Sequence, residues 1–260
     1  MLINKTYVER AESLANPLGR KLLKLISEKE SNLAFSADLT DRQKLLELTD
    51  KVGPHICVLK THLDIMDGFD GSLVSDLRCL ADKHGFLILE DRKFADIGST
   101  VRSQYRDGYL KIADWADSVT VHAVAGYGTV QGLKEVGAPK GRSCLLLAEM
   151  SSSGNLMDER YTRSVMQMAV DCSDFVMGFI AQRRLMEVPD FLYFTPGIGL
   201  VHGKDNLGQN YRDPAEAVSE RGTDVMIVGR HIYDAKDPVS EALRYRELGW
   251  KGYLKRIQRG

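Results

Sequence analysis

An acid and an amine lie two residues apart at the end of an apolar run in the segment Phe86–Lys93. Residues 86–89 are all apolar, which is typical of a strand that is buried on both faces. Charged residues follow directly at positions 90–93. Because side chains two apart in a strand point to the same face, Asp91 and Lys93 should project together. A carboxylate beside an ammonium group at the end of a buried strand indicates a catalytic arrangement.

Polar side chains also follow other apolar runs of the chain. These ends carry Ser36 and Asp38, Lys60 and His62, His122, Glu149 and Ser151, and Gly229 and Arg230. Four of the charged side chains would alternate in sign around one mouth, namely Asp38, Lys60, Asp91 and Lys93. Because buried ion pairs rarely repay their desolvation in stability, such a ring favours function over a structural role. His62 and His122 fit core histidines as well as ligands, and Glu149 fits a hydrogen bond to a neighbour.

Eight short apolar runs alternate with helical segments and should form strands. They are Leu33–Asp38, Ile56–Leu63, Phe86–Lys93, Ser118–Val124, Cys144–Met150, Phe175–Ala181, Leu192–Ile198 and Val225–Arg230. Eight such units within about 250 residues predict an α/β fold, a single (β/α)₈ TIM barrel with extra N-terminal helices. An open doubly wound sheet is the alternative, although no G-x-G-x-x-G follows the first run. In a barrel, the site lies at the carboxyl ends of the strands.

Helical periodicity and capping residues separate these runs. Residues 4–30 should be helical, and the last helix should cover about residues 237–257. Helix starts are indicated at Thr40 or Asp41, at Asp158, and at Asp213, which is followed by Pro214. Without a linker or a low-complexity segment, we expect residues 1–260 to form one domain.

Composition excludes several classes of protein. The net charge of −1 over 260 residues gives no electrostatic reason to expect nucleic acid or an anionic membrane as partner. The four cysteines, Cys57, Cys79, Cys144 and Cys172, contain no C-x-x-C pair, so neither a disulfide framework nor a zinc site is expected. No apolar run approaches the roughly 18 residues of a membrane span, and no signal peptide is evident. The expected location is the cytoplasm.

Two glycine-containing loops near the C-terminus suggest a phosphate site. Barrels commonly bind phosphate with the loops after their seventh and eighth strands. Here these loops contain Pro196–Gly199 and Val228–Arg230, and Arg230 can grip an anion with two hydrogen bonds. The loop 199–212 between them is long, and a long loop over a barrel mouth is often a lid.

Five motifs, in order along the chain, resemble those of the orotidine 5′-phosphate decarboxylase family. They are Leu59-Lys60-Thr61-His62, D-x-K-x-x-D-I-G-x-T from Asp91 to Thr100, Ala148-Glu149-Met150-Ser151-Ser152, Thr195-Pro196-Gly197, and Ile227-Val228-Gly229-Arg230. The resemblance spans essentially the whole chain. Asn210 replaces a family glutamine in the lid, and the segment after Ser151 departs from the family pattern, so the shape of the base-covering loop is not predicted.

The resemblance implies decarboxylation of orotidine 5′-monophosphate to UMP, the last step of de novo pyrimidine biosynthesis, without metal or organic cofactor. It implies that Lys93 protonates the ring carbanion within a charge array of Lys60, Asp91, Lys93 and Asp96. The substrate-binding residues that it implies are Asp38, Lys60, His62, Asp91, Thr100, Ser151, Pro196, Gln209, Tyr211, Gly229 and Arg230. It also implies a homodimer in which Asp96 and Thr100 reach the partner's site, and it leaves open a fusion to orotate phosphoribosyltransferase.

Two other functions remain open at this point. A related phosphosugar-acting barrel also uses D-x-K-x-x-D, but with Mg²⁺ and an enediolate. It would need further carboxylates near Asp91, and Glu90 should point to the opposite face, which leaves Glu149. The second alternative is a nucleotide-binding protein without catalysis, which the retention of both lysines and both aspartates disfavours.

Overall fold

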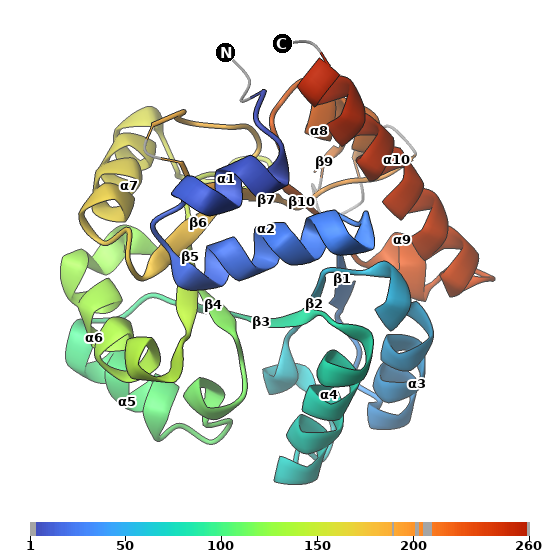
Figure 1. Cartoon of the computed structure of the whole chain (residues 1–260). Helices are drawn as coiled ribbons and strands as arrows, with labels where there is room; N and C mark the ends of the chain where they lie inside the picture. The colour runs from blue at the N-terminus through green and yellow to red at the C-terminus, as the bar shows by residue number, and fades with distance from the viewer. Residues whose placement is uncertain (1–3, 189, 201–202, 205–209, 259–260) are drawn as a thin grey trace.

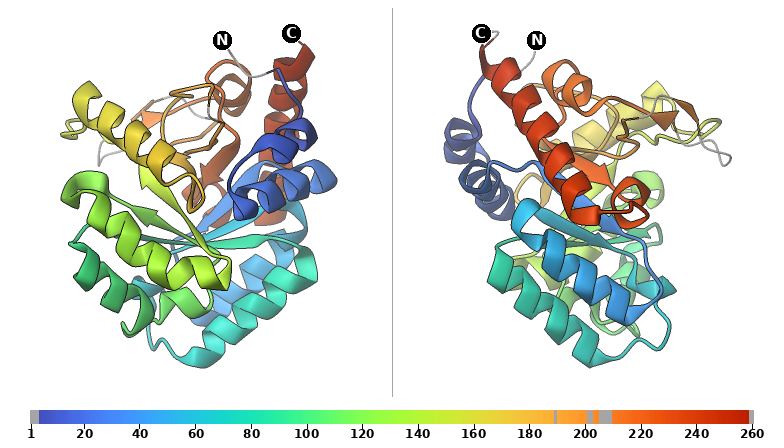
Figure 2. Two further views of the ribbon diagram at one scale, coloured as in Figure 1. Left: turned by 60° about the vertical axis from the view of Figure 1, so that its left-hand side comes forward. Right: turned by 90° about the vertical axis from the view of Figure 1, so that its right-hand side faces the viewer.

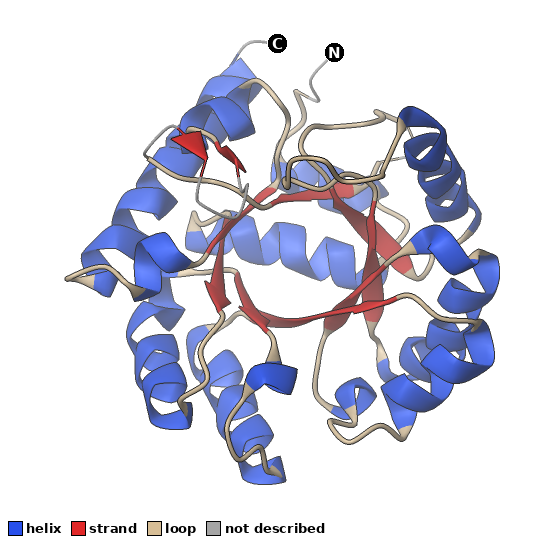
Figure 3. Cartoon of the chain, turned by 180° about the vertical axis from the view of Figure 1, so that it is seen from behind, coloured by secondary structure: helices blue, strands red, loops and turns tan. Residues whose placement is uncertain are grey.

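The barrel is closed and parallel. The computed structural model describes residues 4–188, 190–200, 203–204 and 210–258. Within these residues, eight strands hydrogen-bond in the cyclic order β1-β2-β3-β4-β5-β6-β7-β10, with the helices outside them (Figures 1 and 3). The strands are β1 (Leu33–Ala37), β2 (Val58–Thr61), β3 (Leu87–Phe94), β4 (Ser118–Val121), β5 (Ser143–Leu147), β6 (Val176–Ile180), β7 (Leu192–Thr195) and β10 (Val225–Val228). Each overlaps one predicted run, so the predicted (β/α)₈ fold is confirmed.

Helices follow most of the barrel strands, and several of them begin at a capping aspartate. They are α3 (Arg42–Val52), α4 (Gly71–His84), α5 (Gly98–Arg106), α6 (Tyr127–Gly137), α7 (Glu159–Asp171), α8 (Pro214–Ser219), α9 (Arg230–Tyr233) and α10 (Pro238–Gln258). Single turns of 3₁₀-helix are η1 (Gly53–His55), η2 (Leu63–Ile65), η3 (Ile112–Asp114), η4 (Ala123–Ala125) and η5 (Ala138–Lys140). Asp41, Asp158 and Asp213 accept hydrogen bonds from the first turns of α3, α7 and α8, as predicted.

The N-terminal segment is two helices rather than one. α1 (Tyr7–Ser13) and α2 (Pro17–Lys29) are separated by residues 14–16. Pro17 cannot continue a helix from the preceding residues, and the Asn16 side chain caps α2 by accepting from the Gly19 N–H at 2.9 Å. The predicted helical segment 4–30 is therefore present as two N-terminal helices, with a break at residues 14–16.

Both N-terminal helices cover the amino ends of the barrel strands. The Asn16 amide donates to the Asp174 carbonyl just before β6, and its oxygen accepts from Ser143 at the start of β5. In Figure 2 (right), α1 and α2 lie at one end of the barrel, and the hairpin of β8 (Gly203–Lys204) and β9 (Asn210–Tyr211) lies at the other. The carboxyl ends of the strands therefore remain accessible.

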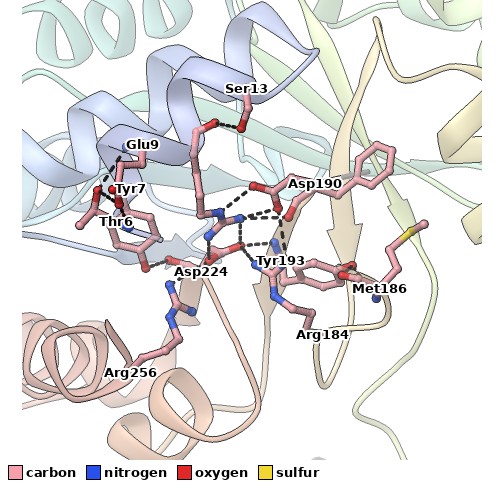
Figure 4. A network of polar contacts seen from close by, with 12 residues as sticks. Thr6, Tyr7, Glu9, Ser13, Arg184, Met186, Asp190, Tyr193, Asp224 and Arg256 are labelled. Carbon is pink, nitrogen blue, oxygen red and sulfur yellow. Dashed lines mark hydrogen bonds and ion pairs between the residues drawn. The ribbon is translucent and has the colours of Figure 1, made fainter. Parts of the chain in front are cut away.

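A buried ion network ties α1 and α10 to the amino end of the barrel (Figure 4). Asp224, which precedes β10, is fully buried and pairs with the guanidinium groups of Arg10, Arg184 and Arg256. Arg10 also pairs with Asp190 at 2.7 Å. Burial alone would raise the pKa of Asp224, but Arg10, Arg184 and Arg256 hold it well below its usual range.

β3 differs from the other barrel strands because part of it is not buried. Every residue of β1, β2, β4, β5, β6, β7 and β10 is buried. β3 is buried from Leu87 to Glu90 and again at Phe94, but residues 91–93 are only half-buried. The charged segment of the sequence therefore lies where the barrel opens.

None of the described helices is long and apolar enough to cross a membrane. Cys57, Cys144 and Cys172 are buried free thiols, and Cys79 is an exposed one. Cys57 and Cys144 thus pack as small apolar side chains in the barrel wall.

Candidate active site

A cavity of about 280 Å³ opens at the carboxyl ends of the strands. It is lined by Ser36, Asp38, Lys60, His62, Asp91, Lys93, Leu147, Met150, Ser151, Ile180, Pro196, Gly197, Ile198, Tyr211, Ile227, Gly229, Arg230 and His231. Figure 3 looks toward this end of the barrel, where the β8–β9 hairpin lies at the rim. Residues from the ends of β1, β2, β3, β5, β6, β7 and β10 therefore meet in one place, as a barrel site requires.

Four charged side chains form a continuous chain along one wall of the cavity. The Lys60 ammonium lies 3.1 Å from Asp38 Oδ1 and 3.1 Å from Asp91 Oδ2. Lys93 Nζ lies 2.7 Å from Asp91 Oδ1. The Lys60 side chain is only 6% exposed, whereas that of Lys93 is 33% exposed and reaches the cavity. The predicted alternation of Asp38, Lys60, Asp91 and Lys93 is thus present.

The array keeps its groups ionised although they are buried. Burial alone would raise the pKa of Asp91, but the Lys60 charge, a hydrogen bond from His62 and the Lys93 charge hold it well below its usual range. Burial would lower the pKa of Lys60, but Asp91 and Asp38 raise it. The pKa of Asp38 is lowered as well, because Lys60 and His62 outweigh its burial. A carboxylate and an ammonium are therefore held charged against the cavity.

The pairing of Asp91 with Lys93 does not come from regular strand alternation. The register between β3 and β4 shifts between Glu90 and Phe94, and Lys93 has a φ of 51°. A left-handed residue inside a strand is uncommon outside glycine and occurs at functional sites. The prediction that Asp91 and Lys93 lie together is correct, but a bulge, and not an ideal strand, brings them together.

Thr120 of β4 is part of this arrangement and was not predicted from the sequence. Its hydroxyl donates to Asp91 Oδ1 at 2.7 Å and accepts from the Lys93 backbone N–H at 2.9 Å. The available hint was a hydroxyl residue inside an apolar run, two positions before His122. Burial and the Lys93 charge lower the pKa of His122, while Asp91 acts in the opposite direction.

The opposite side of the cavity carries the groups predicted for an anion. Arg230 begins α9, and its Nη2 donates to the Tyr211 hydroxyl at 2.8 Å. Pro196 and Gly229 line the cavity beside them. His231 also lines it and was not predicted; its Nδ1 lies 3.1 Å from the Tyr245 hydroxyl. The side chain of Gln209 lies outside the described residues.

Ser151 and Glu149, which both follow β5, differ in whether they reach the cavity. Ser151 and its neighbour Met150 line the cavity, in keeping with the predicted contact to a ligand. Glu149 accepts from the Gln182 N–H at 2.9 Å and pairs with Arg183 at 3.2 Å. Glu149 is therefore engaged in holding the β6 loop.

Asp96 and Thr100 lie away from this cavity in the single chain. Neither lines it, and Asp96 is exposed with its carboxylate accepting from the Ile97 N–H at 2.7 Å. Its backbone is fixed, because Thr129 donates to the Asp96 carbonyl at 2.7 Å and Gly98 packs directly on Gly128 of α6. Within one chain the array therefore has three members from Lys60 to Lys93.

Across the described ranges, no group of three or more His, Cys, Asp or Glu side chains is placed to hold a metal ion. Glu90, the residue beside Asp91, is turned away from the cavity. Its carboxyl group accepts from the Thr61 hydroxyl at 2.6 Å and from the Leu63 N–H at 3.0 Å. Burial raises the pKa of Glu90 to about 8.

Comparison with known proteins places these residues in a family. Residues 31–245 match the orotidine 5′-phosphate decarboxylase / HUMPS family. The chain is 50% identical to orotidine 5′-phosphate decarboxylase of Schizosaccharomyces pombe, over 97% of each chain. It is 51% identical to the protein of that name from Phycomyces blakesleeanus, over 99% of this chain and 98% of the relative. It is 49% identical to bovine uridine 5′-monophosphate synthase, over 93% of this chain and 50% of that protein.

Solved structures show the same barrel. Orotidine 5′-monophosphate decarboxylase of Methanocaldococcus jannaschii, complexed with the inhibitor BMP, matches with a TM-score of 0.67 and 21% identity. The match covers 84% of this chain and 98% of that one. Orotidine 5′-phosphate decarboxylase from Pyrococcus horikoshii matches with a TM-score of 0.64 and 25% identity over the same shares.

Proposed function

The chain belongs to the orotidine 5′-phosphate decarboxylase / HUMPS family, and from this we propose that it converts orotidine 5′-monophosphate to UMP and CO₂ with its own side chains alone. The observation that carries the proposal is the charge array, in which Asp91 lies 3.1 Å from Lys60 and 2.7 Å from Lys93 at the cavity wall. About 50% identity over 97% of each chain to a decarboxylase supports the substrate.

The reaction demands strong stabilisation of charge. Loss of CO₂ leaves an electron pair on a ring carbon that has no adjacent carbonyl to delocalise it. Enzymes lower barriers by about 8–23 kcal/mol, and this reaction requires the upper part of that range. Groups fixed before the reaction and aimed at the developing charge contribute most, because they need no reorganisation.

Lys93 is the proton donor in this proposal. Its ammonium faces the cavity and neutralises the developing carbanion as the carbon–carbon bond to CO₂ breaks. The proton then passes from Nζ to the ring carbon, which gives UMP and a neutral amine that regains its proton from water. Lys60 holds Asp91 in place and, with Asp38, binds the ribose hydroxyls.

Asp91 would contact the substrate carboxylate and repel it until CO₂ leaves. Two unit charges about 4 Å apart interact by about 4 kcal/mol at an effective dielectric constant of 20. This repulsion accounts for only part of the required lowering of the barrier, which enzymes achieve over a range of about 8–23 kcal/mol. Stabilisation of the carbanion by Lys93 must therefore supply a larger part of it. The repulsion requires that Asp91 stay ionised, which the low pKa of Asp91 provides.

The remaining contacts supply binding energy remote from the reacting carbon. Arg230, Tyr211, Gly229 and Gln209 would hold the phosphate, and Ser151 the pyrimidine edge. Binding energy gained there can order the charged wall, which raises kcat and not only affinity. The predicted lid, the loop 199–212, lies in part outside the described residues. Pro196, His62 and Thr100 would complete the contacts to the nucleotide.

The direct test is a spectrophotometric assay of orotidine monophosphate loss. Wild-type protein should turn over, and Lys93→Ala should lower kcat by several orders of magnitude while UMP still binds. Lys83→Ala, which removes an exposed ammonium paired with Asp50, is the matched control and should keep wild-type turnover. Near-normal turnover of Lys93→Ala would remove this lysine from the proton-donor role.

The assay also separates the two rivals. A Mg²⁺-dependent phosphosugar enzyme would lose its activity in EDTA, whereas the proposed reaction should be unaffected. A nucleotide-binding protein would bind UMP without consuming orotidine monophosphate.

We further propose a homodimer with shared sites, in which Asp96 and Thr100 enter the partner's cavity. Two observations support it: Asp96 is exposed, and apolar side chains that follow β3 and β4 are open to solvent, with Ile97 60% and Val124 70% exposed. Exposed apolar side chains of this kind often mark interfaces. The array of Lys60, Asp91 and Lys93 would then gain its fourth member from the second chain.

Mixing two inactive variants tests the shared site. A dimer of Asp96→Ala with Lys93→Ala has one site that contains both native side chains. Random exchange should restore about one quarter of wild-type activity, since half of the dimers are mixed and each has one intact site. Subunit exchange without recovery of activity would contradict the shared site.

Membership of this family also suggests a domain organisation and a cellular location for the chain. We propose that residues 1–260 form one decarboxylase domain, equivalent to the part of bovine uridine 5′-monophosphate synthase that this chain matches. A cytoplasmic location accords with the free thiols of Cys57, Cys79, Cys144 and Cys172.

A further inference from the structure

The part of β3 that carries Asp91 and Lys93 contains more residues than the part of β4 that lies opposite it. Glu90 pairs with Val119 and Phe94 pairs with Val121, so residues 91–93 lie opposite Thr120 alone. Lys93 adopts a φ of 51° within this bulge. Its N–H is thereby withdrawn from the regular ladder and needs another acceptor, because an unpaired backbone donor at such a place is costly.

The Thr120 hydroxyl supplies that acceptor and has one hydrogen left to donate. Lys93 N–H donates to Thr120 Oγ1 at 2.9 Å. A backbone N–H cannot accept, so the hydroxyl hydrogen is directed to Asp91 Oδ1, which lies 2.7 Å away. One buried side chain therefore connects the backbone of the proposed proton donor with the carboxylate of its neighbour.

Asp91 is surrounded by donors on both oxygens. Oδ1 faces the Thr120 hydroxyl at 2.7 Å and Lys93 Nζ at 2.7 Å. Oδ2 faces Lys60 Nζ at 3.1 Å and His62 Nε2 at 3.3 Å. Three of these donors belong to the long side chains of Lys60 and Lys93 and to the ring of His62, whereas Thr120 is a β-branched residue in the middle of a buried strand.

We propose that Thr120 is a positioning residue for decarboxylation: its hydroxyl fixes the plane of the Asp91 carboxylate and the left-handed backbone of Lys93. The inference rests on the proposed function, in which Asp91 must keep its place while a substrate carboxylate of the same charge approaches. Without the hydroxyl, Asp91 can rotate about its side-chain bonds away from the substrate, and Lys93 Nζ moves with it.

Two substitutions separate the hydroxyl from the shape of the residue. Thr120→Val keeps the β-branch and the volume but removes the hydrogen bonds, whereas Thr120→Ser keeps the hydroxyl. For Thr120→Val we expect kcat to fall about 10- to 100-fold, the range for one lost hydrogen bond to a charged group. KM for orotidine monophosphate should change less than 3-fold, and Thr120→Ser should stay within about 5-fold of wild-type kcat.

The control is Thr49→Val, which removes another fully buried threonine hydroxyl, in α3 on the outside of the barrel. It should keep wild-type kcat. Equal loss in Thr120→Val and Thr120→Ser, or wild-type kcat in Thr120→Val, would overturn the proposal.

A second measurement does not depend on turnover. In protein labelled with ¹³C at the aspartate carboxyl carbon, the Asp91 resonance is assigned with Asp91→Asn and titrated with acid. The other groups that face Asp91 are Lys60, His62, Lys93 and His122, and all are retained in Thr120→Val.

Loss of one donor should raise the pKa of Asp91 in Thr120→Val and leave it near the wild-type value in Thr120→Ser. An unchanged titration in Thr120→Val would overturn the positioning role. If wild-type protein failed to decarboxylate the nucleotide, the proposed function would fall, while this titration would still decide whether Thr120 orients Asp91.

Discussion

Replacing Asp224 by asparagine should destabilise the protein more than replacing Arg10 by methionine, although Arg10 is the larger side chain. The described ion network contains three guanidinium groups, from Arg10, Arg184 and Arg256, and two carboxylates, from Asp190 and Asp224. Asp224→Asn leaves three positive charges against one negative charge at a fully buried position. Arg10→Met leaves two of each.

The expected magnitudes follow from this imbalance. Removing one partner of a buried ion pair costs about 3–5 kcal/mol, because the remaining charge is left uncompensated. For a protein of this size, 1 kcal/mol corresponds to about 2–4 °C, so Asp224→Asn should lower Tm by about 6–20 °C. Arg10→Met removes a donor from Asp190, Asp224 and the Phe191 carbonyl. Both carboxylates keep another guanidinium, from Arg184 or Arg256, so the expected loss is about 1–3 kcal/mol.

Scanning calorimetry of the three proteins at pH 7 provides the measurement. Turnover at 25 °C should be retained in both variants, since the network lies at the opposite end of the barrel from Lys93. The folded-state pKa of Asp224 is depressed, so its contribution is present above the unfolded value near 4 and is lost as pH falls. The difference in Tm between wild type and Asp224→Asn should therefore shrink below about pH 4. A Tm for Asp224→Asn within 2 °C of wild type, or a larger loss in Arg10→Met, would refute the reasoning.

Three further outcomes are expected. Arg230→Ala should raise KM for the nucleotide at least 10-fold, with a smaller change in kcat; a fall in kcat at constant KM would contradict the phosphate assignment. Lys60→Met removes the strongest of the charges that keep Asp91 ionised against its burial, so the pKa of Asp91 should rise and the acid limb of the kcat–pH profile should move to higher pH; an unmoved limb would exclude this role. Gly98→Ala should lower both Tm and kcat, because a Cβ there would overlap the Gly128 carbonyl and displace the start of α5; wild-type values in both assays would show that the contact can relax.

Local patterns in the sequence were sufficient for the barrel and for most of the cavity wall. Strands buried on both faces appear as continuous apolar runs, and carboxyl ends of parallel strands must meet at one end of a barrel. For this reason the sequence alone predicts that Asp38, Lys60, Asp91 and Lys93 lie together. The caps of α3, α7 and α8 were equally local, because an aspartate accepts from N–H groups only two or three residues away.

Other features depended on contacts between distant segments. Arg10 meets Asp224 across 214 positions in the chain, so no pattern in either segment indicates the pair. His231 and Tyr245 come together only because α9 and α10 pack beside the rim. The break between α1 and α2, in contrast, has a local cause, because Asn16 caps α2 and Pro17 is its first residue.

The segment from Asp91 to Thr100 shows which features are determined by the local sequence and which by the tertiary structure. Residue types and spacing alone determined that an acid and an amine stand at the mouth of a barrel, because both properties are local to one strand. The tertiary structure decided how they face each other: β4 lies beside β3 with only Thr120 opposite residues 91–93, and this mismatch turns Lys93 into a left-handed conformation. A register shift between strands is a property of the pair of strands, and no single run of residues contains it.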